Sequence, residues 1–520
     1  MKGLPVLSDV IHAALDRRLW VFLAGMTCLA PSMAQGFAST PYTPDALTRH
    51  HLQRLADEAG LPLLTTQWPL PADAVRKVLA APVPAALESS RLHVLSDLDR
   101  HQQAYVQIHW HTRSETLPGY GDNYTPGSGV RLQSPEWRWG DQLAGRLGFK
   151  AERHPNSLQQ AGPLDPSPDS AALLAEGSSL VANLHGWNLN MRAHPQWWGP
   201  GWQSSLVDGS NHPVWHSVGI QRSSIEPSAF PLLKWIGSWN FDFFVARIED
   251  PRVVPQQPRH PLFSGMRLTF KPAPWIEVGL SRGLQTGGQG RPSGVSNFVK
   301  ALLGQEVNKD ISDAFVDGSG QIAGYDVRLV CPDHWQLTLK GSCSFYTQWM
   351  GEDAAGKLPL PYKFMSLWGV EHVWSEGRYR AHVEWTNTNG YSLPWDSKPS
   401  FPGYVNGVYQ QGYTQGARWI GSAFGSGARV LTLGLLDAQS GLQIRLHAGR
   451  LQSTPGSYNP SVIQAPQGRL QALSVSHGVA VAGWQLSPEM SYMHLDQGQD
   501  QSGLKKHSLL FGLSAQKRWP

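Results

Sequence analysis

Charged residues, cysteines and long apolar runs are all scarce in this chain of 520 residues. Charged residues make up 16%, against roughly 25% in ordinary soluble domains. The apolar run at residues 19–30 is shorter than the ~18 residues that a membrane-spanning helix needs, so the sequence predicts no transmembrane helix. The formal net charge is only +4 and the Lys and Arg residues are scattered, which argues against nucleic-acid binding.

The N-terminus has the features of a secretory signal peptide. Arg17 and Arg18 precede the apolar run, and Ser32, Met33 and Ala34 form a small-x-small cleavage pattern. We therefore expect residues 1–34 to direct export and to be removed.

Three cysteines limit the disulfides of the exported chain. Cys28 lies within the expected signal peptide, and residues 25–27 are a poor lead-in for lipidation at that cysteine. Cys331 and Cys343 then remain in an oxidising compartment, where one disulfide between them is possible. The sequence leaves this open, because it does not show whether their Cα atoms lie within bonding distance.

Residues 35–103 have the pattern of a small helical domain. Thr43 is a candidate helix cap, and Gly60 ends the first helix. Two more amphipathic helices are expected at residues 73–81 and 84–100. Their apolar stripes indicate the core of a small bundle rather than a groove for a partner.

From residue 104 to the C-terminus, apolar and polar residues alternate with a period of two, which predicts strands. The clearest runs lie at residues 105–111, 239–247, 325–329, 335–340, 379–385 and 442–448. The 53 Gly and 22 Trp residues suit turns and interfacial anchors, and a mean hydropathy of −0.31 fits a wall with one apolar and one polar face. We predict that residues 104–520 form an all-β transmembrane barrel in the outer membrane, with roughly sixteen to twenty antiparallel strands.

The sequence shows no convincing catalytic or metal-binding set. Gly279, Ser281 and Gly283 match the G-x-S-x-G nucleophile pattern, but a Gly-rich loop follows where a hydrolase needs a helix. His109 and His111 share one strand face without a third ligand at a matching spacing. We therefore expect no enzyme, no metal and no cofactor.

The densest aromatic group lies in a Gly/Pro-rich segment. Flat indole rings stack on sugar faces, while interfacial anchoring or loop packing at the barrel rim is the competing interpretation. Adjacent carboxylates in a loop, without the spacing of an acid/base pair, are candidates for ion or glycan contacts. The candidate polysaccharide-binding residues are Trp197, Trp198, Trp202, Arg291, Glu352 and Asp353.

Several short motifs follow one another in an order typical of one family. They are Trp68-Pro69-Leu70, Glu176-Gly177-Ser178, Trp197-Trp198-Gly199-Pro200-Gly201, Trp235-Ile236-Gly237, Gly265-Met266-Arg267, Glu277-Val278-Gly279-Leu280-Ser281-Arg282, Gly324-Tyr325-Asp326-Val327-Arg328, Gly351-Glu352-Asp353, and the series Asn406, Tyr409, Gly412, Tyr413 and Gly421. Through their shared order the chain resembles the capsule assembly protein Wzi family of outer-membrane proteins.

This resemblance implies a barrel of about eighteen strands with a helical bundle at its periplasmic end. It implies a lectin that attaches or organises capsular or other exported polysaccharide at the cell surface. We expect a monomer in contact with outer-membrane lipid. The chain departs from the family pattern in a Pro/Ser-rich stretch at residues 156–175 and at Gln410 and Gln411, where a His-containing pattern is expected, which leaves the polysaccharide open.

Two other functions compete with glycan binding. A porin or substrate-specific channel would share the architecture but keep an open lumen. An outer-membrane hydrolase or acyltransferase would need a Ser or carboxylate constellation, and the sequence offers none.

Overall fold

The computed structural model describes most of the chain after the expected signal peptide. The described residues are 37–112, 117–122, 128–153, 171–248, 258, 260–292, 294–303, 319–354, 361–391, 401–406, 408–409, 412–416, 418–451, 468–496 and 507–519. The expected signal peptide with Cys28, the departures at Gln410 and Gln411, and residues 156–170 of the Pro/Ser-rich stretch lie outside them. Within these ranges, no helix combines the length and the apolar character needed to cross a bilayer.

The N-terminal part is a helical domain with three short strands. Its elements are β1 (Pro41–Tyr42), α3 (Ala46–Glu58), β2 (Gln67–Trp68), β3 (Leu70–Pro71), α4 (Ala72–Val78), the 3-10 turn η1 (Ala85–Leu87) and α5 (Glu88–His101). The expected cap at Thr43 is wrong: the Asp45 carboxylate accepts the Thr48 N–H at 2.7 Å and caps α3. Thr43 instead donates its hydroxyl to the Pro195 carbonyl at 3.2 Å, a contact that only the folded chain brings about.

The rest of the chain is a large antiparallel sheet. Its strands are β4 (Ala104–His111), β5 (Ser128–Gln133), β6 (Trp137–Trp139), β7 (Leu143–Arg146), β8 (Gly148–Arg153), β9 (Ala171–Leu174), β10 (Ser179–Leu184), β11 (Trp187–His194), β13 (Trp215–Arg222), β14 (Ser238–Arg247), β15 (Leu262–Ala273), β16 (Ile276–Thr286), β17 (Ser319–Val330), β18 (Gly341–Ala354), β19 (Pro361–Trp374), β20 (Tyr379–Tyr391), β21 (Phe401–Pro402), β24 (Arg429–Asp437), β25 (Leu442–Leu451), β26 (Gly468–His477), β27 (Val479–Val481), β28 (Trp484–Asp496) and β29 (His507–Trp519). Outside this sheet lie β12 (Trp197–Trp198), β22 (Thr414–Gln415), β23 (Arg418–Trp419), η2 (Pro231–Ile236), α6 (Val295–Leu302) and α7 (Asp333–Leu339).

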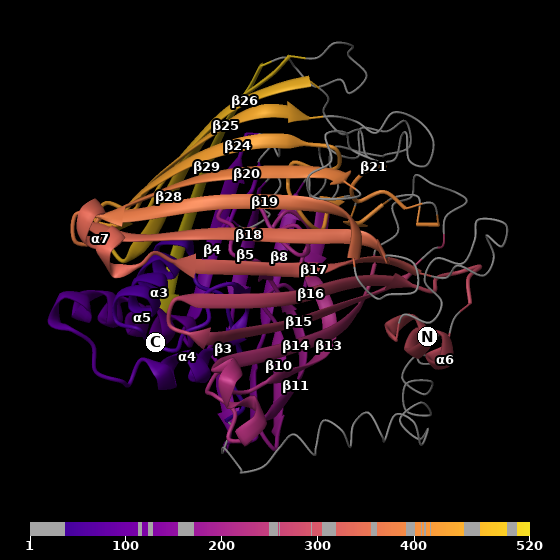
Figure 1. Ribbon diagram of the computed structural model, residues 1–520, viewed down its shortest axis with the longest axis horizontal. Helices are drawn as coiled ribbons and strands as arrows, with labels where there is room; N and C mark the ends of the chain where they lie inside the picture. Colours follow the sequence, from indigo (N-terminus) through magenta and orange to yellow (C-terminus); the bar gives the residue numbers. More distant parts are fainter. Residues whose placement is uncertain are drawn as a thin grey trace.

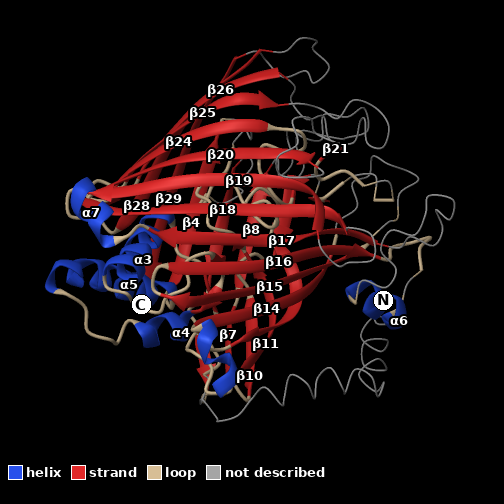
Figure 2. Ribbon diagram, viewed as in Figure 1, coloured by secondary structure: helices blue, strands red, loops and turns tan. Residues whose placement is uncertain are grey.

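The sheet closes on itself, as Figure 2 shows in red. Its last strand, β29, pairs with its first, β4, and every neighbouring pair is antiparallel. Of its 23 segments, β5 with β6, β7 with β8, β9 with β10, and β26 with β27 are halves of four interrupted strands, and β21 is a two-residue addition to β20. Eighteen strands therefore form the described wall, and the predicted all-β transmembrane barrel is confirmed.

Burial along the strands is inverted relative to a soluble protein. In β14, Asn240 and Asp242 are fully buried, while Trp239, Phe241 and Phe243 on the other face are partly exposed. Successive side chains of a strand point to opposite faces, so the polar set lines the lumen and the apolar set faces outward. An apolar outer face is what a lipid-embedded wall requires.

The two ends of the barrel differ. Short turns join β19 to β20, β24 to β25 and β27 to β28 at one end, where α3, α4, α5 and the C-terminus also lie (Figure 1). We name this the turn end and the opposite end the loop end. Tryptophan side chains at the turn end are strongly exposed: Trp139 by 80%, Trp235 by 66% and Trp275 by 57%. Such a belt is typical of a membrane–water interface.

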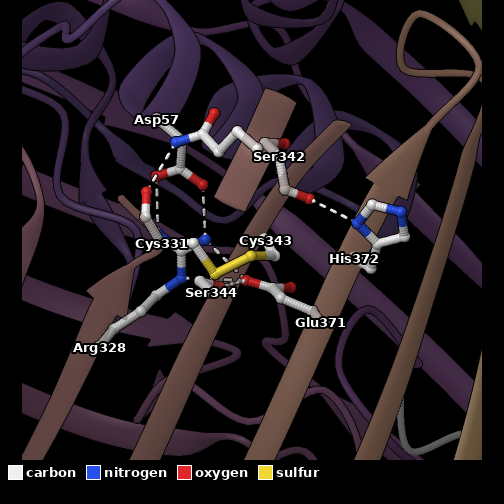
Figure 3. Close-up of a disulfide and its surroundings, with 9 residues drawn as sticks. Asp57, Arg328, Cys331, Ser342, Cys343, Ser344, Glu371 and His372 are labelled. Carbon is white, nitrogen blue, oxygen red and sulfur yellow. Dashed lines mark hydrogen bonds and ion pairs between the residues drawn. A yellow bond between two sulfur atoms is a disulfide. The ribbon is translucent and has the colours of Figure 1, made fainter. Parts of the chain in front are cut away.

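The strand predicted at residues 335–340 is wrong, because α7 occupies this stretch between β17 and β18. Pro332 is its N-cap residue and Asp333 lies in its first turn, positions that favour a helix start. A period of two over six residues did not outweigh these signals. Cys331 and Cys343, which flank the helix, form a disulfide with a Cα–Cα distance of 5.3 Å (Figure 3).

Candidate functional site

The lumen contains a segment of the chain itself, residues 195–214, which we name the plug segment. Its strand β12 pairs with β2 of the N-terminal domain, so two irregular segments meet inside the barrel. Irregular backbone inside a barrel needs hydrogen-bond partners, because a buried N–H or C=O group without one costs free energy. The polar inner face of the wall supplies them.

Glu384 of β20 is the clearest such partner. Its carboxylate accepts the backbone N–H groups of Trp202 at 2.8 Å, Gln203 at 3.3 Å and Ser204 at 2.8 Å. The Tyr346 hydroxyl donates a fourth hydrogen bond at 3.1 Å. The side chain is fully buried, and both of its oxygens accept hydrogen bonds. Glu384 thus holds the plug segment through the backbone of that segment.

Glu371 of β19 joins the plug segment to the helical domain. It accepts the Trp202 indole N–H at 2.7 Å and pairs with Arg328 at 2.6 Å and with Arg380. Arg328 also donates to both carboxylate oxygens of Asp57 in α3, at 2.8 and 2.6 Å (Figure 3). One buried network therefore connects helix, wall and plug segment.

Arg49 of α3 supports the plug segment from the turn end. Its guanidinium donates to the carbonyls of Pro200 at 2.7 Å and Gly201 at 2.8 Å. It also lies over the rings of Tyr120, at 4.1 Å, and Trp202, at 4.5 Å. A planar guanidinium suits this combined role, which a lysine ammonium cannot reproduce.

A histidine pair lies where α3 meets the barrel. The two nitrogens of His50 contact the Gly377 carbonyl at 2.8 Å and Arg380 Nε, which donates at 2.9 Å. Burial and the Arg380 charge hold the pKa of His50 well below its usual value. Burial also lowers the pKa of the neighbouring His51 to about 3. Both rings are therefore neutral near pH 7.

The three candidate tryptophans lie inside the barrel and not on its surface. Exposure is 3% for Trp197, 0% for Trp198 and 5% for Trp202. The Trp198 ring packs edge-on against Phe244 at 5.6 Å, and the Trp202 ring stacks on His382 at 5.8 Å. Protein covers the faces of all three rings, which agrees with the packing interpretation. In this arrangement the ring faces are not accessible to a sugar outside the barrel.

At the loop end, residues 401–406 and 412–416 fold over the plug segment. The hydroxyls of Tyr404 and Tyr413 donate to the carbonyls of Leu206 at 3.0 Å and Val207 at 2.9 Å. The two tyrosine rings stack with centroids 5.8 Å apart. Glu352, near the end of β18, accepts the Tyr404 N–H and so anchors this cover. Glu352 therefore has a structural contact within the described chain.

The remaining candidates, Arg291 and Asp353, lie at the same end of the barrel. Arg291 stands in the turn after β16 and is half-buried, and its N–H donates to the Gly288 carbonyl at 3.1 Å. Asp353 follows Glu352 in β18 and pairs in register with Tyr362. The structure brings these residues to one end of the barrel, opposite the disulfide at the turn end.

The two weaker motifs of the sequence, the G-x-S-x-G pattern and the histidines of residues 109–111, lie within strands of the wall. Ser281 lies in the middle of β16, faces the lumen and accepts a hydrogen bond from Arg267 at 2.7 Å, so no nucleophile turn exists. His109 is buried with Nε2 at 3.7 Å from a Glu152 carboxylate oxygen. Across the described ranges, no group of three His, Cys, Asp or Glu side chains is placed to hold a metal ion.

The sequence interpretation missed the residues that organise the lumen. Glu371, Glu384 and Arg49 were not singled out, because each acts on a partner more than 150 positions away. A usable signal was present for Glu384, which alternates with Val383 and Trp385 in β20 and therefore falls on the polar face of that strand.

Comparison with known proteins gives three consistent results. The family model described as "Capsule assembly protein Wzi" matches residues 100–508. A Klebsiella pneumoniae protein, described as an uncharacterized 55.8 kDa protein in the cps region, is 27% identical over 369 residues, which are 68% of this chain and 66% of that protein. The solved structure of Wzi, described as a carbohydrate-binding β-barrel and an outer-membrane protein involved in group 1 capsule assembly in Escherichia coli, aligns with a TM-score of 0.73 at 21% identity, covering 92% of this chain and 100% of Wzi. At that identity the structural likeness shows the fold.

Proposed function

Because this chain belongs to the Wzi family of capsule assembly proteins, we propose that it binds capsular or other exported polysaccharide and holds it at the cell surface. One observation carries the proposal: the barrel fills its lumen with its own plug segment, tied to the wall by buried Glu371 and Glu384. A lumen filled in this way suits a protein that presents a surface and not one that passes solutes. The carbohydrate binding described for Escherichia coli Wzi supports the same function.

The loop end is the binding surface in this proposal. Short turns and termini face the periplasm in outer-membrane barrels, while longer connections face outward. Arg291, Glu352 and Asp353 lie at the loop end, where they contribute polar contacts to the glycan. Trp197, Trp198 and Trp202 contribute indirectly: they pack inside the plug segment, which supports the loop-end cover of residues 401–406 and 412–416.

The remaining parts of the proposal follow from this arrangement. Residues 1–34 direct export and are removed, the helical domain stays in the periplasm, and lipid surrounds the apolar wall of a monomer. In this proposal the protein carries out no chemical step, and the buried carboxylate of Glu384, for example, holds the plug segment. It holds the polysaccharide without a cofactor.

Binding of the purified, detergent-folded protein to polysaccharide from its own source cells tests the proposal. We expect saturable binding that weakens in Arg291→Ala. Arg378→Ala is the matched control, because this exposed arginine lies at the turn end, paired with Asp437 at 3.2 Å. Absence of binding to any surface glycan, together with ion conduction in a planar bilayer, would replace this function with that of a porin.

A further inference from the structure

Three arginines lie side by side on the outer face of the barrel at the loop end. Strand register places Arg429 of β24 opposite Arg450 of β25, and Arg450 opposite Arg469 of β26. These three strands are neighbours in the wall (Figure 1). Directly paired residues on antiparallel strands have Cβ atoms roughly 5 Å apart, and like charges at that distance destabilise the sheet. We name these three residues the arginine row.

The arginine row points away from the lumen. The residue that follows each arginine is buried in one interior cluster: Val430 is 0% exposed, Leu451 3% and Leu470 1%. Since neighbouring residues of a strand point to opposite faces, the arginines point outward. Arg450 and Arg469 are exposed and Arg429 is half-buried.

The row stands at the edge of the apolar outer wall. Leu431 and Leu433 follow Arg429 on the same face of β24 and are 37% and 43% exposed, the expected state of a lipid-facing side chain. Two residues along a strand span about 7 Å, so the arginines lie one step beyond the first leucine. That is the level at which lipid headgroups begin.

The polar surroundings leave the row strongly positive. Arg429 donates to the Tyr391 hydroxyl at 2.7 Å, while its Nε is buried and has no partner. Among the described residues, Asp496 of β28 lies opposite Arg469 and places one carboxylate beside the row. Two residues before Asp496 on β28, and so closer to the apolar wall, His494 lies opposite His507 of β29. Their Nδ1 atoms are 3.2 Å apart.

We propose that the arginine row is a binding site for the phosphate groups of an outer-leaflet glycolipid. Guanidinium groups form bidentate hydrogen bonds with phosphate, which offsets the repulsion among the three arginines. The outward direction and the position just beyond the leucines select lipid phosphate over a soluble ligand at the mouth of the barrel. This site is separate from the proposed polysaccharide surface, which lies over the lumen.

Titration of the detergent-solubilised full chain with bisphosphorylated lipid A, followed by native mass spectrometry, tests the site. We expect saturable binding that weakens about tenfold or more in the double variant Arg450→Gln, Arg469→Gln, because two charge-assisted contacts are lost. Arg247→Gln is the matched control: this exposed arginine ends β14 and pairs with Leu262, so it has no arginine neighbour in register.

Three further probes decide the ligand, and retained heat-modifiable migration shows that each variant is folded. With the unaltered protein, fully dephosphorylated lipid A is expected to bind at least tenfold more weakly than the bisphosphorylated form. Equal binding of the two forms, or equal binding by the double variant, would overturn the proposal. Competition by millimolar inorganic phosphate, or by the cells' own polysaccharide, as strong as by lipid A would also overturn it, because the row would then be a general anion or glycan site.

Discussion

Replacing Glu384 with alanine tests whether wall carboxylates hold the plug segment in place. The change removes the acceptor of three backbone N–H groups, those of Trp202, Gln203 and Ser204, and of the Tyr346 hydroxyl. Leaving a buried donor without a partner costs about 1–3 kcal/mol. Water entering the vacated space satisfies some of these four donors. We therefore expect the docking of the plug segment to weaken by about 3–6 kcal/mol.

The barrel itself is expected to survive this change. The ladder hydrogen bonds of β20 with β19 and β24 do not involve the Glu384 side chain. The lost free energy therefore appears as local opening of residues 202–204 and not as unfolding of the wall.

Hydrogen exchange of the plug segment, measured by mass spectrometry in detergent, reports this opening. Every 1.4 kcal/mol is tenfold in an equilibrium, so residues 202–204 are expected to exchange at least about a hundredfold faster in Glu384→Ala. Glu384→Gln keeps one acceptor oxygen, so its exchange rate at residues 202–204 is expected to lie between those of the unaltered protein and of Glu384→Ala. Val383→Ala, on the outward face of the same strand, is the control that leaves exchange unchanged.

Exchange at residues 202–204 within threefold of the unaltered protein would refute the reasoning. It would mean that the other contacts of the plug segment, among them β12 and the loop-end cover, hold it without Glu384. Planar-bilayer recordings give an independent readout, since a released plug segment raises the frequency of ion-conducting openings.

Three other changes test the turn end. Arg49→Lys is expected to loosen the plug segment by about 2 kcal/mol, seen as faster proteolysis, because one ammonium cannot reach both carbonyls and both rings. The pKa of His51 falls from about 6.5 unfolded to about 3 folded, so the helical domain is expected to keep full stability above pH 6.5 and to lose it as pH falls toward 3. Circular dichroism melts between pH 7.5 and 4.5 check this, and His51→Gln is expected to flatten the slope. The variant Cys331→Ser, Cys343→Ser is expected to lose about 2–3 kcal/mol locally, because the disulfide closes a loop of 12 residues; a urea midpoint that does not move would contradict this.

The wall was predictable from sequence because its physics is local. In β14, alternation of Asn240 and Asp242 with Trp239, Phe241 and Phe243 is enough to assign two faces, and the same pattern recurs from strand to strand. Lipid on one side and a polar lumen on the other impose a period of two on every strand. The stretch at residues 335–340 shows the limit, since six alternating residues after Pro332 folded as α7.

The plug segment was not predictable in the same way. Trp197, Trp198 and Trp202 form an aromatic group among glycines and prolines, a composition that suits a sugar-binding loop as well as a packed interior. Burial of these rings is decided by Arg49 of α3 and by wall residues of β18 to β20, which come together only when the barrel closes. No local pattern carries that information.

The scarcity of charge has a structural explanation in these contacts. Backbone groups that lack a strand or helix partner must be satisfied wherever they lie, and at membrane depth the wall is the available source. Glu277 accepts the backbone N–H groups of Thr65 and Thr66 at 2.8 and 2.9 Å, and Glu384 does the same for the plug segment. A lipid-facing wall tolerates few charges, and these two acids of the strands lie where irregular backbone crosses the lumen. Substituting either acid is therefore expected to release one segment of lumen filling while the barrel around it remains closed.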